Sequence, residues 1–93
     1  MKQALTSAEI KEALQKIPGW TLQDGKLTRE WTFKDFIQAM EFVNKIATLA
    51  EAAGHHPDID IRYNRVHLSL VSHDAGGITQ RDANMAKQIN QKF

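Results

Sequence analysis

The chain has 93 residues, 42% of them hydrophobic and 25% charged, which predicts one small globular domain over residues 1–93, short enough to favour self-association. Its formal net charge is +1, and acidic and basic residues are interspersed throughout, so no electrostatic footprint for nucleic acid or an anionic membrane results. It lacks cysteine, a signal-peptide-like segment and any apolar run near the ~20 residues of a membrane span, so we expect a cytoplasmic protein without disulfides or thiolate chemistry.

The first predicted element is an amphipathic helix over residues 6–17. Thr6 stands three residues before Glu9, which is the spacing of a capping box, and apolar residues follow at helical spacing. Pro18 and Gly19 then end the helix. We expect this helix to cover part of the core.

A β-hairpin is predicted next, over residues 20–33. Its turn is Asp24-Gly25, a dipeptide that suits a type I′ turn, and this places Leu22 opposite Leu27. The same register puts both tryptophans on one apolar face. We therefore interpret the tryptophans as core residues.

Residues 34–54 predict a long helix that ends at Gly54, in the position of a C-cap glycine. Its apolar face is wide, so we expect burial against the sheet and also against a partner subunit. The predicted stripe consists of Phe36, Met40, Val43, Ala47 and Ala50, widened by Ile46, Leu49 and Ala53.

The remaining residues predict a second hairpin and a final helix. With Asn64-Arg65 as the loop, Ile61 would face Leu68, and Thr79 would cap the helix. The resulting order, α-ββ-α-ββ-α, predicts an α+β two-layer sandwich: an antiparallel four-stranded sheet with helices on one face. The face opposite the apolar one would carry Asp60, Arg62, His67 and Ser69, and one face of the helix would carry Met85, Ala86, Ile89 and Phe93.

Two adjacent histidines, His55 and His56, follow the predicted end of the long helix. The helix dipole there favours an imidazolium, and Pro57 stiffens the pair. Rigid histidines suit general acid–base chemistry. The alternative is a structural loop in which the imidazoles bond the last helical carbonyls, and the pair alone does not separate the two.

Three more polar residues are candidates for the same site. His73 ends the last strand, where small sheets tend to carry function. Asp82 either completes a capping box with Thr79 or orients an imidazole. Glu51 lies one helical turn before His55, so it either contacts that imidazole or is an ordinary solvated residue.

Other chemistries fit the sequence less well. Three histidines with Asp82 or Glu51 could ligate zinc or iron, but adjacent residues seldom present both imidazoles to one ion, and metal-binding histidine spacings are missing. No serine stands in a nucleophile elbow, and the glycines at 76–77 indicate a turn and not a phosphate-binding loop. We therefore expect no metal.

Considered together, the candidate residues form one pattern. Glu51, the triplet His55-His56-Pro57, Tyr63, His73 and Asp82 follow one another at intervals of three, five, nine and eight residues, and this resembles the signature of pterin-4a-carbinolamine dehydratases. The segments "DFIQAMEFVNKIA", "YNRVHL" and "SHDAGGITQRD" are similar to the same family. The likeness extends from about residue 20 to residue 89. Gly54 is a departure, because the family often has an acidic or polar residue before the histidine pair.

The resemblance implies a dehydratase that converts a 4a-hydroxytetrahydropterin to the quinonoid dihydropterin and water. It implies recycling of the pterin cofactor of an aromatic amino acid hydroxylase, without a cofactor of the dehydratase's own. It assigns His55 and His73 as the acid–base pair and His56 as a charged contact to the pterin. The residues that would bind the substrate or shape its pocket are Glu51, Gly54, Pro57, Ser72, Asp74 and Asp82.

The resemblance also implies a homodimer or homotetramer. Two alternatives remain open: a binding or dimerisation module that acts like a transcriptional coactivator, and a domain that acts on another pterin, such as one of molybdopterin metabolism. The intact set of three histidines and two carboxylates favours catalysis over a pure scaffold.

Overall fold

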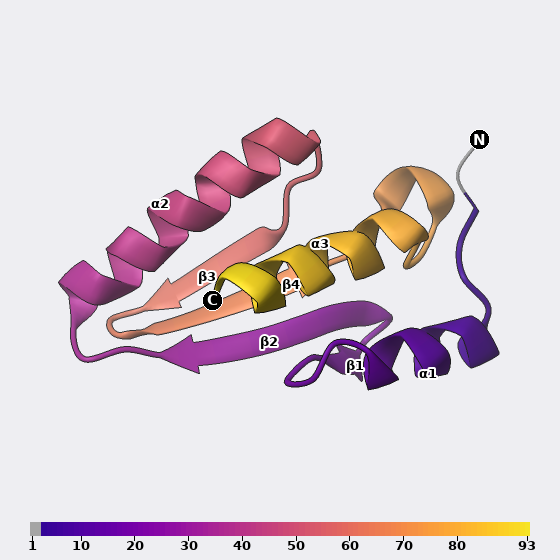
Figure 1. The fold of residues 1–93 in the computed structure, drawn as a ribbon, viewed down its shortest axis with the longest axis horizontal. Helices are drawn as coiled ribbons and strands as arrows, with labels where there is room; N and C mark the ends of the chain where they lie inside the picture. Colours follow the sequence, from indigo (N-terminus) through magenta and orange to yellow (C-terminus); the bar gives the residue numbers. More distant parts are fainter. Residues whose placement is uncertain (1–2) are drawn as a thin grey trace.

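The computed structural model describes residues 3–93, which form a sheet covered by helices (Figure 1). Over these residues the order of elements is α-ββ-α-ββ-α, as predicted, with a short 3-10 turn before the last helix. The helices are α1 (Ser7–Gln15), α2 (Phe36–Ala53) and α3 (Gln80–Lys92), the strands are β1 (Thr21–Gln23), β2 (Lys26–Thr32), β3 (Asp58–Arg62) and β4 (Arg65–Leu70), and the turn is η1 (His73–Ala75).

The strands pair in the order β1-β2-β4-β3, and every pair is antiparallel. One apolar face of this sheet packs against residues from all the helices, which gives a single core and confirms the predicted α+β two-layer sandwich. The fully buried side chains of that core include Ile17, Leu27, Ile46, Val66, Leu68, Leu70 and Ile89.

The local signals of the first half form the structures they predict. Thr6 and Glu9 make both bonds of a capping box at the start of α1. In the first hairpin Leu22 pairs with Leu27, which confirms the register, although Leu22 itself remains exposed. Trp20 is buried, and its indole Nε1 donates to the Oδ1 atom of Asn90 at 2.9 Å.

The predicted register of the second hairpin is wrong by two residues. Ile61 pairs with Val66 and not with Leu68, so the loop consists of Tyr63 and Asn64. Tyr63 has a φ of +53°, which sequence rules would not choose for a tyrosine. The loop is held from outside the hairpin, because the side-chain amide of Asn64 donates to the carbonyl of Phe33 at 2.9 Å.

The predicted buried stripe of α2 is also wrong in its orientation. The residues that α2 buries are Ala39, Phe42, Ile46 and Ala50; of these, Ala50 was in the predicted stripe and Ile46 in its widened part. Phe36 and Ala47 are exposed, and Met40 and Val43 are partly buried. The apolar character of α2 therefore exceeds what its own sheet covers.

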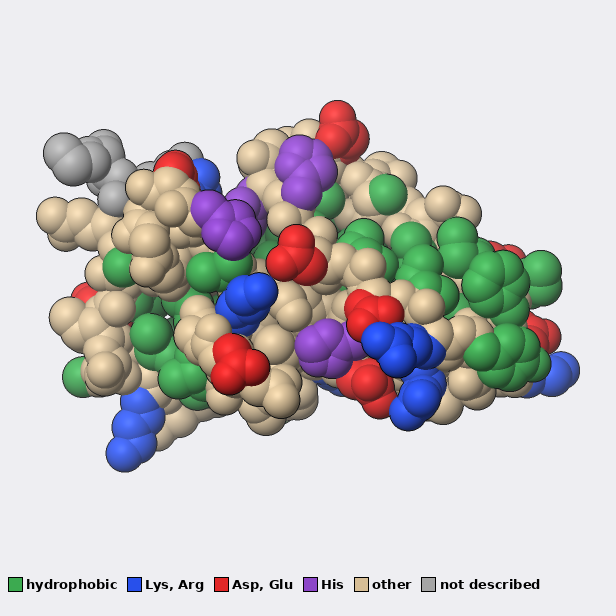
Figure 2. Space-filling view, turned by 180° about the vertical axis from the view of Figure 1, so that it is seen from behind, with side chains coloured by type: hydrophobic (Ala, Val, Ile, Leu, Met, Phe, Trp, Pro, Cys, Tyr) green, Lys and Arg blue, Asp and Glu red, His purple; other side chains and the backbone are tan. Residues whose placement is uncertain are grey.

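The other face of the sheet is open and polar. His67 on β4 lies between Glu30 on β2 and Asp60 on β3, its two cross-strand partners. Figure 2 shows this face, with charged side chains gathered over the strands. No helix within residues 3–93 has the length and apolarity that crossing a membrane requires.

Candidate active site

The end of α2 turns two neighbouring histidines in different directions. Gly54 adopts the left-handed conformation, with a φ of +64°, and closes the helix. The backbone N–H of His55 donates to the carbonyl of Ala50 at 3.2 Å, which is the six-to-one bond of a Schellman motif. The backbone amide, and not an imidazole, thus satisfies this helical carbonyl. Pro57, directly after the histidines, is buried.

His55 is directed toward α3, where it meets Asp82. Its Nε2 atom lies 2.5 Å from Asp82 Oδ1, and the two side chains are only 12% and 0% exposed. Because a carboxylate only accepts hydrogen bonds, Nε2 carries a proton and Nδ1 is the ring nitrogen left for a ligand. A buried aspartate of this kind fixes both the tautomer and the orientation of the imidazole.

The second oxygen of Asp82 belongs to the start of α3. Asp82 Oδ2 accepts from the backbone N–H of Thr79 and from the hydroxyl of Ser72, both at 2.8 Å. Thr79 caps α3, and Thr79 with Asp82 forms a complete capping box. Both interpretations of Asp82 therefore hold at once: it caps the helix with one oxygen and orients His55 with the other.

His56 forms the second carboxylate–imidazole pair. Its Nε2 atom lies 2.6 Å from Glu51 Oε2, with side chains 63% and 81% exposed. Of the two alternatives for Glu51, neither a contact with His55 nor simple solvation describes the structure, because the left-handed Gly54 ends the helix before His55 can continue the i, i+4 row and Glu51 pairs with His56.

His73 begins η1, the turn that joins β4 to α3. Its side chain is exposed and makes no hydrogen bond with the described residues, so its ring nitrogens are open to a ligand. Its neighbours in sequence are both attached to α3: Ser72 reaches Asp82, and Asp74 Oδ1 lies 2.5 Å from Arg81 Nη2.

Arg81 is the site residue that sequence reasoning missed. Its side chain is partly buried, and its Nε atom is buried without a hydrogen-bond partner in the described structure. One signal was available: a cation in the first turn of a helix opposes the helix dipole, so its presence there calls for a separate reason.

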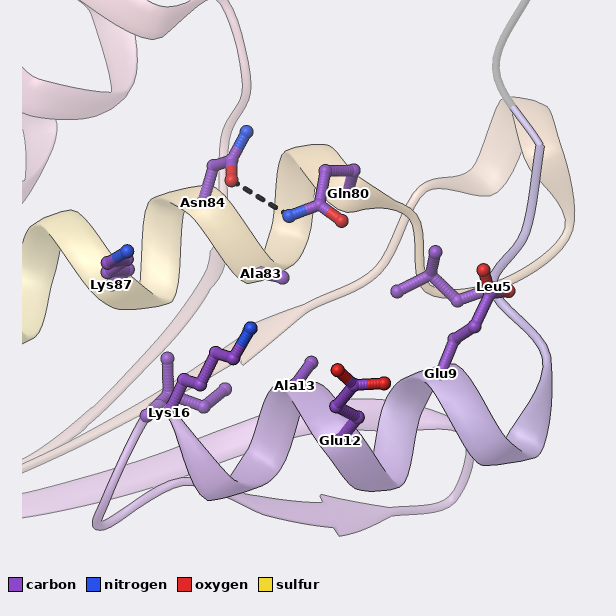
Figure 3. A pocket seen from close by; sticks show the side chains of 10 residues that line it. Leu5, Glu9, Glu12, Ala13, Lys16, Gln80, Ala83, Asn84 and Lys87 are labelled. Carbon is purple, nitrogen blue, oxygen red and sulfur yellow. Dashed lines mark hydrogen bonds between the residues drawn. The ribbon is translucent and has the colours of Figure 1, made fainter.

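A cavity of about 180 Å³ opens beside His55, between the end of α2 and the first half of α3. His55 and Arg81 both line it, together with Ala53, Asn84, Met85 and Gln88. A larger cavity, about 270 Å³, lies between α1 and α3. Figure 3 shows Glu12 of α1 and Lys16, directly after α1, facing this groove. None of the predicted site residues lines that groove, whereas His55 lines the smaller cavity.

The arrangement suits proton transfer. An imidazole backed by a buried carboxylate can accept a proton as a base or donate one as an imidazolium. In residues 3–93 no three histidine, aspartate or glutamate side chains are grouped to hold a metal ion.

Comparison with known proteins identifies relatives over the full length. The family model described as pterin 4 alpha carbinolamine dehydratase matches residues 3–92. A relative from Nostoc punctiforme, provisionally named a pterin-4-alpha-carbinolamine dehydratase, is 55% identical over 98% of both chains. One from Acidobacterium capsulatum with the same provisional name is 58% identical over 91% of this chain and 92% of its own.

Two solved structures share the fold. A Brucella melitensis protein described as a transcriptional coactivator/pterin dehydratase superposes with a TM-score of 0.89 at 40% identity, covering 96% of this chain and 97% of its own. A pterin dehydratase-like protein described as a RuBisCO assembly factor in the alpha-carboxysome superposes with a TM-score of 0.66, covering 82% of this chain and 90% of its own. At 22% identity, the second likeness concerns the fold alone.

Proposed function

Because the chain belongs to the pterin 4 alpha carbinolamine dehydratase family, we propose that it dehydrates a 4a-hydroxytetrahydropterin to the quinonoid dihydropterin and water. The observation that carries this proposal is the contact of 2.5 Å between His55 and the fully buried Asp82. A solvated loop histidine would not need a buried carboxylate, whereas an acid–base catalyst needs an imidazole of fixed orientation.

The reaction requires one proton in and one proton out. The C4a–O bond breaks, the hydroxyl group leaves as water after gaining a proton, and the adjacent ring nitrogen loses its proton as the C=N bond forms. Two imidazoles, one protonated and one neutral, supply and remove these protons without net consumption. His55 and His73 are the proposed pair, and no cofactor is needed for this balance.

His55 would exchange its proton through Nδ1, because Asp82 holds Nε2. The carboxylate stabilises the imidazolium when His55 carries both protons and preserves the tautomer when it carries one. His73 would act from η1, with a ring that makes no hydrogen bond in the described structure. His56 would contact the pterin, with Glu51 holding its ring.

The remaining predicted residues would shape the site. Gly54 and Pro57 fix the chain before and after the histidines, Ser72 supports Asp82, and Asp74 lies on the turn that carries His73. Arg81 joins this set as a lining residue of the cavity beside His55.

The test is a stopped-flow dehydration assay with enzymatically generated 4a-hydroxytetrahydropterin. Wild type should accelerate dehydration over buffer, and His55→Ala and His73→Ala should each lose about 100-fold or more in kcat, which is the usual contribution of a general acid or base. His67→Ala is the matched control, because His67 lies on the open sheet face, and it should retain activity.

A wild-type protein that gives no acceleration would overturn the enzyme proposal. Loss of activity on chelation would instead revive a metal site. If His67→Ala lost as much activity as His55→Ala, the assignment of the site would be wrong even with an active enzyme.

We also propose that the protein self-associates through the apolar side of α2 that its sheet leaves uncovered, as a homodimer or homotetramer. Phe36 and Ile37 are exposed there, at 45% and 67%. An exposed apolar surface of this kind typically marks a protein contact. Sedimentation analysis should show an oligomer for wild type and a smaller species for Ile37→Glu, and a monomeric wild type would contradict the proposal.

The second candidate function, a binding module, depends on the same surface. The Brucella protein is described by both roles, and the exposed apolar side of α2 would suit a protein partner as well as a second copy. The proposed dehydratase would be cytoplasmic. It would act on the hydroxypterin that an aromatic amino acid hydroxylase releases. An inactive wild type that captures a protein through α2 would favour the module instead.

A further inference from the structure

We infer that Arg81 is a positioning residue of the proposed dehydratase site: through its ion pair with Asp74 it holds η1 against α3 and so sets the position of His73. This inference rests on the proposed function for its catalytic consequence. The clamp itself concerns only the geometry of the chain and can be measured without any substrate.

His73 is held through its neighbours in the chain. Its imidazole forms no hydrogen bond within residues 3–93, so no side-chain contact fixes the ring directly. The position of His73 must then depend on its neighbours, Ser72 and Asp74, which lie on either side of it in the chain. Both neighbours are attached to the first turn of α3.

The attachment on the Ser72 side is buried. The Ser72 hydroxyl donates to Asp82 Oδ2 at 2.8 Å, and Ser72 and Gly77 exchange backbone hydrogen bonds at 3.0 and 3.2 Å, which close the base of the turn. This attachment connects the turn to the same carboxylate that orients His55. It leaves the tip of the turn, from His73 to Gly76, without a buried side-chain bond.

The attachment on the Asp74 side is supplied by Arg81. Arg81 Nη2 lies 2.5 Å from Asp74 Oδ1, and the two side chains are 26% and 65% exposed. A charge-assisted bond of this length is directional, but solvent around Asp74 screens the attraction. The pair should therefore fix the geometry of the turn while contributing little to global stability.

The same arginine also borders the cavity beside His55, where its Nε atom is buried without a partner. Arg81 is thus the residue that contacts the turn carrying His73 and also lines the cavity of His55. Its first-turn position in α3, unfavourable for a cation, is accounted for by this role.

The first experiment measures the clamp without substrate. Amide hydrogen exchange at Ala75 and Gly76, whose N–H groups bond to the carbonyls of Ser72 and His73, should accelerate at least about 10-fold in Arg81→Gln, a modest local opening. Exchange at His55 should not change, and the midpoint of thermal unfolding should stay close to that of wild type. Arg81→Lys should restore part of the protection.

The second experiment tests whether the clamp acts through His73. Arg81→Gln should lower kcat by about 10- to 100-fold, since a displacement near 1 Å can cost that much, with a smaller change in KM. In a His73→Ala background the same substitution should have no further effect on kcat. Asp74→Asn should lower kcat at least as much as Arg81→Gln, and adding Arg81→Gln to Asp74→Asn should cause no further loss.

The matched control is Arg62→Gln. Arg62 pairs with Asp60 at 3.3 Å on the open sheet face, so this change removes a similar exposed pair away from the turn. It should alter neither the exchange at Ala75 and Gly76 nor kcat.

Three outcomes would overturn the inference. Unchanged exchange at Ala75 and Gly76 in Arg81→Gln would show that no clamp exists. A further loss of kcat from Arg81→Gln in the His73→Ala background would show that Arg81 acts directly on the substrate. A large fall in unfolding midpoint would show a structural role. An inactive wild type would contradict the proposed function alone, and the exchange experiment would still decide whether the clamp exists.

Discussion

His55 and His56 are adjacent in the sequence, and each places Nε2 on a carboxylate, at 2.5 Å from Asp82 and at 2.6 Å from Glu51. The two pairs differ in their surroundings. His55 and Asp82 are almost completely shielded from solvent, whereas most of the surface of His56 and Glu51 is exposed. The same two functional groups are therefore placed in two different dielectric environments by one left-handed residue, Gly54.

The distance between two charged groups does not by itself define the function of an ion pair. In the exposed pair, water competes for every hydrogen bond and salt screens the charges, so the contact contributes little to the free energy of unfolding. In the buried pair, losing one partner leaves the other desolvated and unpaired, which is costly.

Asp82→Asn should have the largest effect. The groups around this carboxylate, His55 Nε2–H, the Thr79 N–H and the Ser72 hydroxyl, all donate, so an amide group would bring a donor where acceptors are needed. We expect a loss of about 3 kcal/mol in the free energy of unfolding, measured by urea denaturation. Asp60→Asn on the open sheet face is the control, and equal losses in both variants would refute the contrast.

Gly54→Ala should rank second. A Cβ at this position meets no atom within 4 Å, so the cost is that of an L-residue in the left-handed region, about 1–2 kcal/mol. Activity should also fall, because both histidines follow this residue. Gly25→Ala provides the control: its φ is +75° with equal space, so stability should fall similarly while kcat is preserved. Loss of activity in both variants would contradict the role assigned to Gly54.

Ser72→Ala should cost about 1 kcal/mol, because a buried hydroxyl that bonds Asp82 and lies 2.8 Å from the Thr79 hydroxyl is removed. The measurement is again the urea midpoint, with Ser69→Ala, on the open face of β4, as the control. If the two serine variants were equally stable, Asp82 would not depend on Ser72 for its orientation.

Glu51→Gln should have the smallest effect. Its change in the free energy of unfolding should stay within about 0.5 kcal/mol and should vanish near about 1 M salt. Urea denaturation at low and high salt measures this. A loss as large as that of Asp82→Asn would mean that burial does not separate the two pairs.

The sequence predicted most of the fold because its local signals are self-contained. Capping boxes at Thr6 and Thr79 and the Asp24-Gly25 turn depend only on residues a few positions apart, and all three form as expected. The order of the elements and their two layers follow from the same signals.

The errors arise where contacts with a distant part of the chain determine the local structure. The second hairpin turns at Tyr63 and Asn64, and Asn64 is bound to Phe33 of another segment. The buried face of α2 is centred on Phe42 and Ile46. The prediction of this face failed because a helix that is apolar on two sides does not reveal from its own sequence which side meets the sheet.

The candidate site was only partly predicted, because its contacts also join distant parts of the chain. The sequence indicated Asp82 as a cap or as a partner of an imidazole, but the pairing of Asp82 with His55 spans 27 positions. Helical spacing offered a contact between Glu51 and His55 as one of two alternatives for Glu51, but the left-handed Gly54 places Glu51 against His56. Arg81 was missed because its partner, Asp74, belongs to a turn with no regular period.

The two oxygens of Asp82 serve two different purposes, since Oδ2 begins α3 and Oδ1 holds His55. A protein engineer therefore has no substitution at this position that changes the reactivity of His55 without also changing how α3 starts. The same constraint acts on natural variation: a lineage that gave up catalysis would still need an acceptor here to keep the helix. A retained aspartate at position 82 is consequently weaker evidence of activity than a retained histidine at position 55.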